Sequence, residues 1–454
     1  MNISDTKKHS ALEAIQSALA RARAAVDSNA LLSLNEARAL ARAKAVDNGE
    51  VGGRLAGVPF VAKDNFLTVE GTTTAASTFL QDFTAPLQAT AIEKLEAEGA
   101  ICIGKANLDA FAHGGSTENS AFGPTKNAYD KTRVAGGSSG GSAVAVALDI
   151  VPFALGTDTG GSIRQPASFN GVVGVKPTYG AVSRYGVVAM ASSTDTIGVL
   201  ANSVDDAELV MDILSGKDTK DMTTLPDFFT PTSVDSPKRL GVIKECMSDE
   251  VDIEVRSAVK SYIAGMEKKG HIVEEVSLSM LQYALAIYYI VVPAEISSNL
   301  GRYDGVRYGT RSKNARVLAE MYGLSRDQGF MPENKRRIMI GSYVLSSGFF
   351  DAYYLKAQKA RTLLIQEFAA LFEKYDALIG PVVPTPAFKL GENTDDPVKM
   401  YLADVMTVPA SLAGLPALSV PAGVTKGGLP IGVQLIGPRK ADAFLLALAK
   451  DGEE

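Results

Sequence analysis

Apolar positions recur with two different periods along this chain, and the changes of period divide it into regions. Between residues 10 and 48, Ala and Leu recur at helical spacing among Glu and Arg, which predicts two helices broken near Asp27–Asn29. From 50 to 200, short apolar runs alternate with glycine turns. The elements predicted there are strands over Leu55–Ala62 and Ala100–Gly104 and a helix over Thr90–Glu98.

The second half of the chain continues this alternation after a proline-bearing polar loop. A helix is predicted over Val255–Lys269, and residues 280–375 are strongly helical. The strands predicted in this half are Arg239–Ile243, Ile272–Val276, Ala377–Pro384 and two runs within 415–437. Strands alternating with helices predict the α/β class, with a central mixed, twisted sheet covered by helices on both faces. We expect one domain over residues 1–454, in which 1–50 is an N-terminal helical segment and 280–375 is a helical insertion.

The composition is that of a globular enzyme, with 454 residues of which 46% are hydrophobic and 21% charged. The net charge is −6 and no long basic run occurs. A sequence-independent grip on nucleic acid by this chain alone is therefore not expected. A complex in which other subunits hold the nucleic acid stays open.

Cysteine, histidine and hydropathy patterns exclude further classes. The two cysteines, Cys102 and Cys246, exclude a disulfide framework and indicate a reducing compartment, so a cytoplasmic protein is expected. Neither they nor His9, His113 and His271 have the spacing of a zinc site. No charge-free apolar run reaches about 18 residues and the N-terminus lacks a signal-peptide core, so no membrane association is expected.

Two glycine-serine turns, Ala135–Ser142 and Gly156–Arg164, carry the candidate chemistry, and their residues Ser138 and Ser162 lie 24 positions apart. Gly/Ser-rich segments are often flexible linkers. Here, however, apolar runs that belong in a core separate the two turns, so both turns should be anchored. A serine in such a turn becomes a nucleophile when a neighbouring base takes its proton.

Two kinds of base are open for such a serine. Gly136–Gly140 matches the G-x-S-x-G turn of α/β-hydrolases, which need a histidine near the chain end. The histidine with room for an intervening acid, His271, has more than 180 residues after it, which argues against that fold. Lysine can serve instead when burial keeps it neutral, and Lys63 directly follows an apolar run. The alternative for Lys63 is an ordinary surface turn.

The second turn also has anion-binding potential. Consecutive backbone N–H groups can form a nest for an oxyanion, here at Thr159, Gly160, Gly161 and Ser162. A phosphate-binding P-loop is disfavoured because Ser162 stands where that motif requires lysine.

Together these motifs closely resemble the amidase signature family. Lys63, Ser138 in GGSSGGS and Ser162 in DTGGSIRQP fall where that family has its Ser-cisSer-Lys triad, and the resemblance covers about residues 50–440. It implies the amidase signature fold, with Ser162 as the nucleophile, Ser138 as the proton relay through a cis peptide and Lys63 as the base. The implied oxyanion hole is formed by the amides of Thr159, Gly160, Gly161 and Ser162.

Within that family, residues 280–415 resemble the glutaminase subunits of glutamyl-tRNA(Gln) amidotransferases. The resemblance implies hydrolysis of glutamine, with the 280–375 insertion contributing to the glutamine pocket. The implied glutamine-binding residues are Tyr288, Arg337 and Asp404. Arginine holds a carboxylate bidentately, an aspartate suits the α-ammonium, and the tyrosine helps to position the substrate.

The same resemblance implies a heterotrimer with the B and C subunits of such amidotransferases. The B subunit would bind the misacylated tRNA and use ATP and Mg²⁺ to activate it, and this chain would hold no cofactor of its own. Two alternatives stay open: a free-standing amidase for another small amide, and a catalytically silent subunit, against which the intact triad argues. The segment Asp109–Gly114 departs from the family's usual DEFAMG by Ala110 and His113, and His113 either lines the pocket or is a tolerated replacement.

Overall fold

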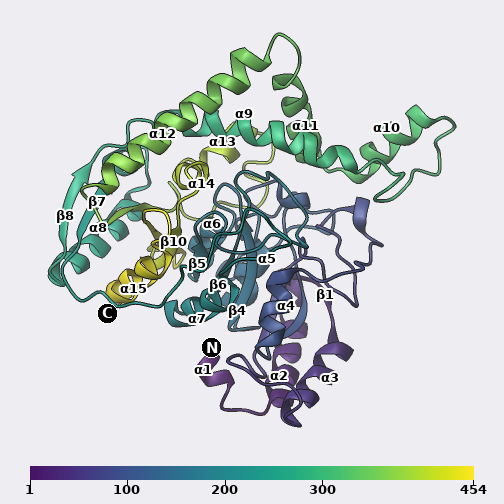
Figure 1. The fold of residues 1–454 in the computed structure, drawn as a ribbon, viewed down its shortest axis with the longest axis horizontal. Helices are drawn as coiled ribbons and strands as arrows, with labels where there is room; N and C mark the ends of the chain where they lie inside the picture. Colours follow the sequence, from purple (N-terminus) through teal and green to yellow (C-terminus); the bar gives the residue numbers. More distant parts are fainter. Residues whose placement is uncertain (454) are drawn as a thin grey trace.

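A mixed sheet of 11 strands runs through the molecule (Figure 1). The computed structural model describes residues 1–453. Across the sheet the strand order is β1-β3-β2-β4-β6-β5-β10-β11-β9-β7-β8. In chain order the strands are β1 Leu31–Leu34, β2 Pro59–Lys63, β3 Ile101–Ala106, β4 Phe153–Asp158, β5 Val173–Lys176, β6 Thr196–Ala201, β7 Arg239–Ile243, β8 Ile272–Val276, β9 Ala377–Pro381, β10 Ala417–Val424 and β11 Pro430–Ile436.

The sheet has a parallel block toward each end and an antiparallel centre. Strand β2 pairs in parallel with β3 and β4, and β7 pairs in parallel with β8 and β9. The strands between these blocks, from β4 through β6, β5, β10 and β11 to β9, pair antiparallel. The predicted mixed sheet is therefore confirmed.

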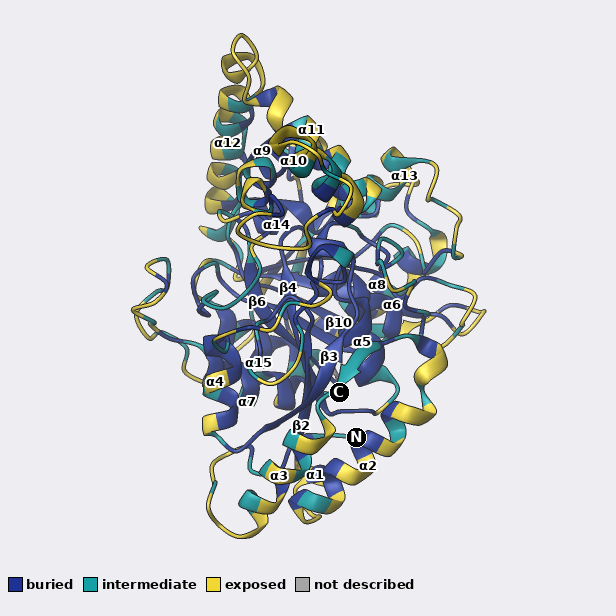
Figure 2. Ribbon diagram, turned by 90° about the vertical axis from the view of Figure 1, so that its right-hand side faces the viewer, coloured by how far each residue is buried: buried dark blue, intermediate teal, exposed yellow. Residues whose placement is uncertain are grey.

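Helices cover both faces of the sheet because successive strand side chains point to opposite sides. In β2, Phe60 and Ala62 enter one apolar core with α4, α7, α8 and α15, and Val61 enters another with α2, α3, α5 and α6 (Figure 2). The helices are α1 Ile3–Thr6, α2 Ala11–Ala24, α3 Glu36–Asp47, α4 Thr90–Ala97, α5 Gly140–Ala147, α6 Arg164–Asn170, α7 Val204–Leu214, α8 Ile253–Lys268, α9 Leu281–Asn299, α10 Leu318–Gly329, α11 Pro332–Val344, α12 Lys356–Phe372, α13 Pro397–Leu402, α14 Val408–Leu412 and α15 Asp442–Glu453.

Most predicted elements lie where the periodicity placed them, and the differences occur at turns. The two N-terminal helices are α2 and α3, and the break between them includes Asn29 in a left-handed conformation. No strand was predicted at β1, β4, β5 or β6. Strand β1 lies between these two helices and pairs antiparallel with β3. Strand β2 begins later than predicted, at Pro59, because Gly57 has a φ of 77° and turns the chain.

Helices α9, α11 and α12 lie together above the sheet, and α10 projects from the body of the molecule (Figure 1). The segment Leu281–Arg302 is long and apolar enough to cross a membrane by length and composition alone. Half of its most apolar window is buried inside the protein, where α9 packs against α11 and α12. Such burial is typical of a core helix, so this segment is weak evidence for a membrane span.

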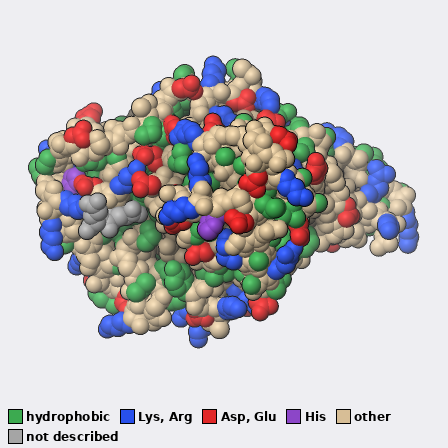
Figure 3. Space-filling model, turned by 90° about the horizontal axis from the view of Figure 1, so that it is seen from below, with side chains coloured by type: hydrophobic (Ala, Val, Ile, Leu, Met, Phe, Trp, Pro, Cys, Tyr) green, Lys and Arg blue, Asp and Glu red, His purple; other side chains and the backbone are tan. Residues whose placement is uncertain are grey.

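Acidic and basic side chains are interspersed over the body of the molecule on the face shown in Figure 3. This distribution agrees with the nearly balanced totals of 45 Lys and Arg against 51 Asp and Glu. The face shown therefore has no broad area of a single charge.

Candidate active site

The two glycine-serine turns lie against each other at the ends of α5 and β4. The backbone N–H of Ser139 donates to the carbonyl of Ser162 at 3.1 Å, which links the turns directly. The peptide bond Gly137–Ser138 is cis. A Cβ on Gly137 would lie 2.1 Å from Asp109 Oδ2, so the turn accepts only glycine there. This tight packing excludes the linker interpretation of the first turn.

Lys63, the last residue of β2, is fully buried beneath the first turn. Its Nζ lies 2.7 Å from Ser138 Oγ, 2.9 Å from Ser139 Oγ and 2.9 Å from Thr157 Oγ1. Burial lowers the pKa of Lys63 to about 7, against the opposing effect of nearby carboxylates. The surface-turn alternative for Lys63 is therefore wrong, and a large fraction of this amine is neutral at neutral pH.

A neutral amine has two N–H groups to donate and one lone pair that accepts. Ser139 Oγ is itself committed as a donor to the carbonyl of Thr157 at 3.2 Å. Ser138 makes no competing donation among the described residues, so its hydroxyl proton is available for the lone pair of Lys63. The pair can therefore move a proton from the first turn to the lysine.

Ser162 lies in the turn between β4 and α6, with its side chain 9% exposed. Its hydroxyl makes no hydrogen bond within residues 1–453, including none to Ser138. A reactive hydroxyl that is partly accessible and uncommitted can approach a bound carbonyl carbon. The structure thus brings Ser162 to the same turn pair as Ser138 and Lys63, and the hydrogen bond between the two serines is not formed in it.

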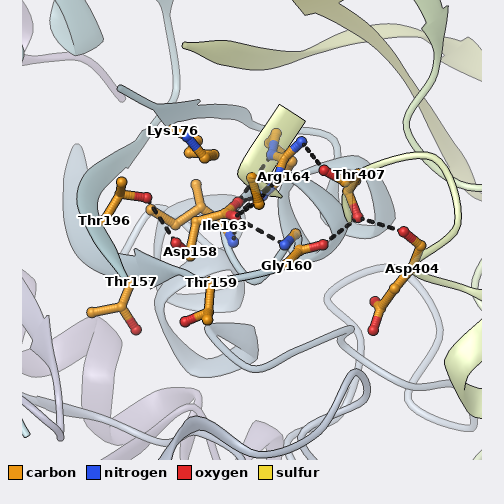
Figure 4. Close-up of polar contacts among 12 residues, drawn as sticks. Thr157, Asp158, Thr159, Gly160, Ile163, Arg164, Lys176, Thr196, Asp404 and Thr407 are labelled. Atoms are coloured by element: carbon orange, nitrogen blue, oxygen red, sulfur yellow. Dashed lines mark hydrogen bonds and ion pairs between the residues drawn. The ribbon is translucent and has the colours of Figure 1, made fainter. Parts of the chain in front are cut away.

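A buried ion pair holds the Ser162 turn in place (Figure 4). Arg164 Nη2 lies 2.9 Å from Asp158 Oδ1, and both side chains are fully buried. The same carboxylate accepts the backbone N–H groups of Gly161 at 2.9 Å and Ile163 at 3.2 Å. Desolvation acts to raise the pKa of Asp158, but the guanidinium of Arg164 outweighs it and holds this pKa below its usual value.

The oxyanion-hole prediction included the amide of Gly161, which the structure shows donated to Asp158 instead. The backbone N–H groups of Gly160 and Ser162 have no partner within the described part of the chain. Thr159 is fixed by its hydroxyl, which donates to Asp195 at 2.8 Å. The backbone N–H of Thr159 is likewise without a partner among the described residues, so Thr159, Gly160 and Ser162 are the oxyanion donors this geometry offers.

The three predicted glutamine-binding residues come from three separate elements. Tyr288 lies on α9, Arg337 on α11, and Asp404 in the turn before α14. A Cβ on Gly160 would lie 2.6 Å from the Tyr288 hydroxyl, so this tyrosine packs directly on the oxyanion turn. Asp404 is tied to the same turn by Thr407, whose hydroxyl donates to the carbonyls of Gly160 at 2.6 Å and Asp404 at 3.1 Å (Figure 4).

Charge is concentrated around Arg337. Its Nε lies 2.8 Å from Glu333 Oε1, and its guanidinium lies 5.3 Å from the ring centroid of Tyr289. Tyr289 in turn donates to Asp404 Oδ2 at 3.1 Å. Desolvation raises the pKa of Asp404 to about 7, although Arg337 opposes this shift. Arg337 and Asp404 thus form a cation and an anion joined through one tyrosine.

A pocket of about 250 Å³ opens beside these groups. Asp109, Gly115, Arg337, Met400 and Tyr401 are among the residues that line it. A small zwitterion fits such a pocket because both charge signs are present at its edge. Among residues 1–453, no group of three or more His, Cys, Asp or Glu is arranged to hold a metal ion.

Comparison with known proteins places the chain in a family. The sequence profile of the amidase family matches residues 13–446. The chain belongs to the amidase family. The matched range of this amidase contains both glycine-serine turns, the buried lysine and the helices that carry Tyr288 and Arg337.

Several similar amidases carry one name. The glutamyl-tRNA(Gln) amidotransferase A subunit of Koribacter versatilis is 51% identical over 432 residues, which is 93% of this chain and 90% of that protein. The protein of the same name from Geobacillus kaustophilus is 52% identical over 94% of this chain and 89% of that protein. The crystal structure of the protein of the same name from Thermotoga maritima superposes with a TM-score of 0.83, at 39% identity over 99% of this chain and 94% of that one.

Four further residues that the sequence patterns did not single out support the predicted triad. Ser139 and Thr157 complete the surroundings of Lys63, and the Asp158–Arg164 ion pair holds the turn that carries Ser162. All four residues belong to the two glycine-serine segments. Only their burial and their distances to Lys63 and Ser162 distinguish them from the other residues of these segments. Ala110 and His113 lie in the core, and the carbonyl of Ala110 accepts from Asn334 at 2.8 Å.

Proposed function

We propose that this amidase is the glutamine-hydrolysing subunit of a tRNA-dependent amidotransferase that converts Glu-tRNA(Gln) to Gln-tRNA(Gln). The observation that carries the proposal is the buried Lys63, with its pKa lowered to about 7 and its Nζ 2.7 Å from Ser138 beside Ser162. The amidotransferase relatives, at about half identity over nearly the whole chain, support the choice of reaction.

The reaction begins when Ser162 Oγ attacks the side-chain carbonyl carbon of glutamine. The hydroxyl proton passes through Ser138 to neutral Lys63, and the amides of Thr159, Gly160 and Ser162 stabilise the oxyanion. Lys63 then returns the proton to the leaving nitrogen, so the C–N bond breaks and ammonia departs. Water next attacks the acyl-enzyme by the same proton route, which releases glutamate and restores Ser162.

Glutamine binding would use the charged pair at the pocket. Arg337 takes the α-carboxylate, Asp404 takes the α-ammonium, and Tyr288 holds the substrate against the Gly160 turn. Because Tyr288 and Arg337 belong to α9 and α11, the 280–375 insertion would contribute to the glutamine pocket.

The ammonia would be used by a partner. In this proposal the chain works in the cytoplasm as part of a heterotrimer with B and C subunits, within a single-domain amidase fold. The B subunit binds the misacylated tRNA and activates it with ATP and Mg²⁺, so this chain needs no cofactor. Co-purification of the B and C subunits with the full-length chain is the expected outcome.

Substitution of the nucleophile tests the proposal. In the assembled complex, Ser162→Ala should abolish transamidation that uses glutamine and leave transamidation that uses ammonium unchanged, because only ammonia release is lost. Ser342→Ala, at an exposed site on α11, is the matched control and should keep both activities. Retained glutamine use by Ser162→Ala would disprove the mechanism. Rapid hydrolysis of a simple aliphatic amide without any response to the B and C subunits would identify a free-standing amidase instead.

A further inference from the structure

Gln165 has a buried side-chain amide at the edge of the candidate active site. No step of the proposed mechanism involves this amide. It lies in the first turn of α6, three residues after Ser162, and its side chain is fully buried. Its Oε1 accepts the backbone N–H of Gly137 at 2.8 Å, next to the cis peptide. Since Gly137 N–H can only donate, this contact fixes Oε1 and Nε2 without ambiguity.

The other end of this amide has no hydrogen-bond partner among residues 1–453, because Nε2 is buried and unpaired. A buried N–H group without an acceptor is costly, so its retention points to an acceptor supplied by a ligand.

Gly115 shows where the unpaired amide points. A Cβ on Gly115 would lie 3.6 Å from Gln165 Nε2 and 3.7 Å from Asp404 Oδ1, with Met400 Sδ at 3.9 Å. Gly115 also lines the pocket that contains Arg337. The donor and the carboxylate therefore both lie within van der Waals reach of the Cβ position of Gly115, and this residue of the pocket lining places no side chain between them and the pocket.

We propose that Gln165 Nε2 donates a hydrogen bond to the α-carboxylate of glutamine, so that Gln165 is a further substrate-binding residue. The inference rests on the proposed function, because it takes glutamine as the substrate. Nε2 requires an acceptor, and glutamine has two kinds, its side-chain carbonyl and its α-carboxylate. The side-chain carbonyl is assigned to Thr159, Gly160 and Ser162. The α-carboxylate shares a carbon with the ammonium that Asp404 holds.

The arrangement couples substrate binding to the relay turn. One amide group reaches the substrate through Nε2 and the Ser138 turn through Oε1. A glutamine lacking its α-carboxylate would leave Nε2 unpaired while the turn stays in place. Gln165 thus selects an amino acid over a simple amide.

The test compares glutamine with 4-aminobutanamide, which is glutamine without its α-carboxylate. Gln165→Glu keeps an oxygen acceptor for Gly137 and replaces the donor by a carboxylate, so the assay is run at alkaline pH, where that carboxylate is ionised. In the full-length chain with its co-purifying subunits, kcat/KM for glutamine should fall roughly 10- to 100-fold. For 4-aminobutanamide it should change by no more than about twofold. Gln282→Glu, at an exposed site on α9, is the charge-matched control.

Other outcomes separate the possible failures. An equal loss on both substrates, or no loss on either, would show that Gln165 acts only through Gly137 and would overturn the inference. If Gln165→Glu does not fold, Gln165→Met is compared on the same two substrates. Its kcat/KM must again fall for glutamine and stay unchanged for 4-aminobutanamide. Wild-type protein that ignores glutamine but hydrolyses other amides would instead overturn the proposed function, and the inference with it.

Discussion

The protonation state of Lys63 is controlled by its burial at the end of β2. Three hydroxyl groups surround its Nζ, and desolvation brings its pKa to about 7. Asp404, more than 300 positions along the chain, is shifted in the opposite direction to the same value. A lysine base and a carboxylate that binds an ammonium are both active in their deprotonated forms, so one pH range governs both residues.

Glutamine hydrolysis should therefore rise with pH through about 7. Below this value Lys63 is protonated and cannot accept a proton, and Asp404 is neutral and cannot hold the ammonium. The check is kcat/KM for glutamine measured from about pH 5.5 to about pH 8.5. Asp404→Asn should raise the KM for glutamine. In this variant the remaining increase of kcat/KM with pH should reflect the deprotonation of Lys63 alone. Lys63→Ala should lower kcat roughly 10²- to 10⁴-fold. A flat profile in wild type would contradict the assignment of the base.

The proposed glutamine pocket depends on how closely α9 and α11 approach each other. Pro293 interrupts the hydrogen-bond ladder of α9, and a Cβ on Gly341 of α11 would lie 1.9 Å from the Pro293 carbonyl oxygen. The two helices therefore contact through backbone at this point. Tyr288 precedes the contact on α9 and Arg337 precedes it on α11, so the contact sets their separation.

Gly341→Ala should push α11 away from α9 and weaken glutamine binding. Overpacking of this kind costs about 1–3 kcal/mol, which lowers the midpoint of urea unfolding, and the KM for glutamine should rise several-fold. Gly265→Ala on α8 is the matched control, because a Cβ there meets no atom within 4 Å. The control should be neutral or stabilising by about 1 kcal/mol or less. Equal behaviour of the two variants would show that this helix contact does not control the pocket.

At the scale of the whole molecule, buried lysines make stability depend on pH. Burial lowers the pKa of Lys63 and of Lys176, another fully buried lysine, from 10.5 to about 7. Between these values the unfolded chain binds two protons that the folded chain does not. The free energy of unfolding therefore rises with pH across this window.

The free energy of unfolding should increase from about pH 7 to about pH 9, by at most about 1.4 kcal/mol per pH unit for each lysine. The urea midpoint should rise with it. Above that window the thiols of Cys102 and Cys246 oppose the trend, since burial raises their pKa to about 11 and about 12. Lys176→Met should halve the slope. Lys131→Met, at an exposed site, should keep it. A midpoint that falls over this range would refute the linkage.

The sequence by itself determined the α/β class and the positions of many elements, and it singled out Lys63, Ser138 and Ser162 as the candidate reactive residues. Hydrophobic periodicity is a local property, so Arg239–Ile243 and Ile272–Val276 were predicted without error. Glycines in the two turns are needed for backbone approach, which made the turns recognisable from their letters alone. Strand β1 was not predicted, because its four residues show no clear alternation of apolar and polar side chains and the strand depends on pairing with β3.

Only the tertiary structure decided what each reactive residue can do. The pKa of Lys63 depends on burial against residues distant in sequence, such as Ser138, which is 75 positions away. The engagement of the Gly161 amide depends on the orientation of Asp158. The sequence does not distinguish Gln165 from other helix residues. Its candidate binding role follows from the unpaired Nε2 and from its position beside Gly115, which has no side chain. Desolvation and hydrogen-bond direction are properties of three-dimensional neighbours, and sequence spacing does not encode them.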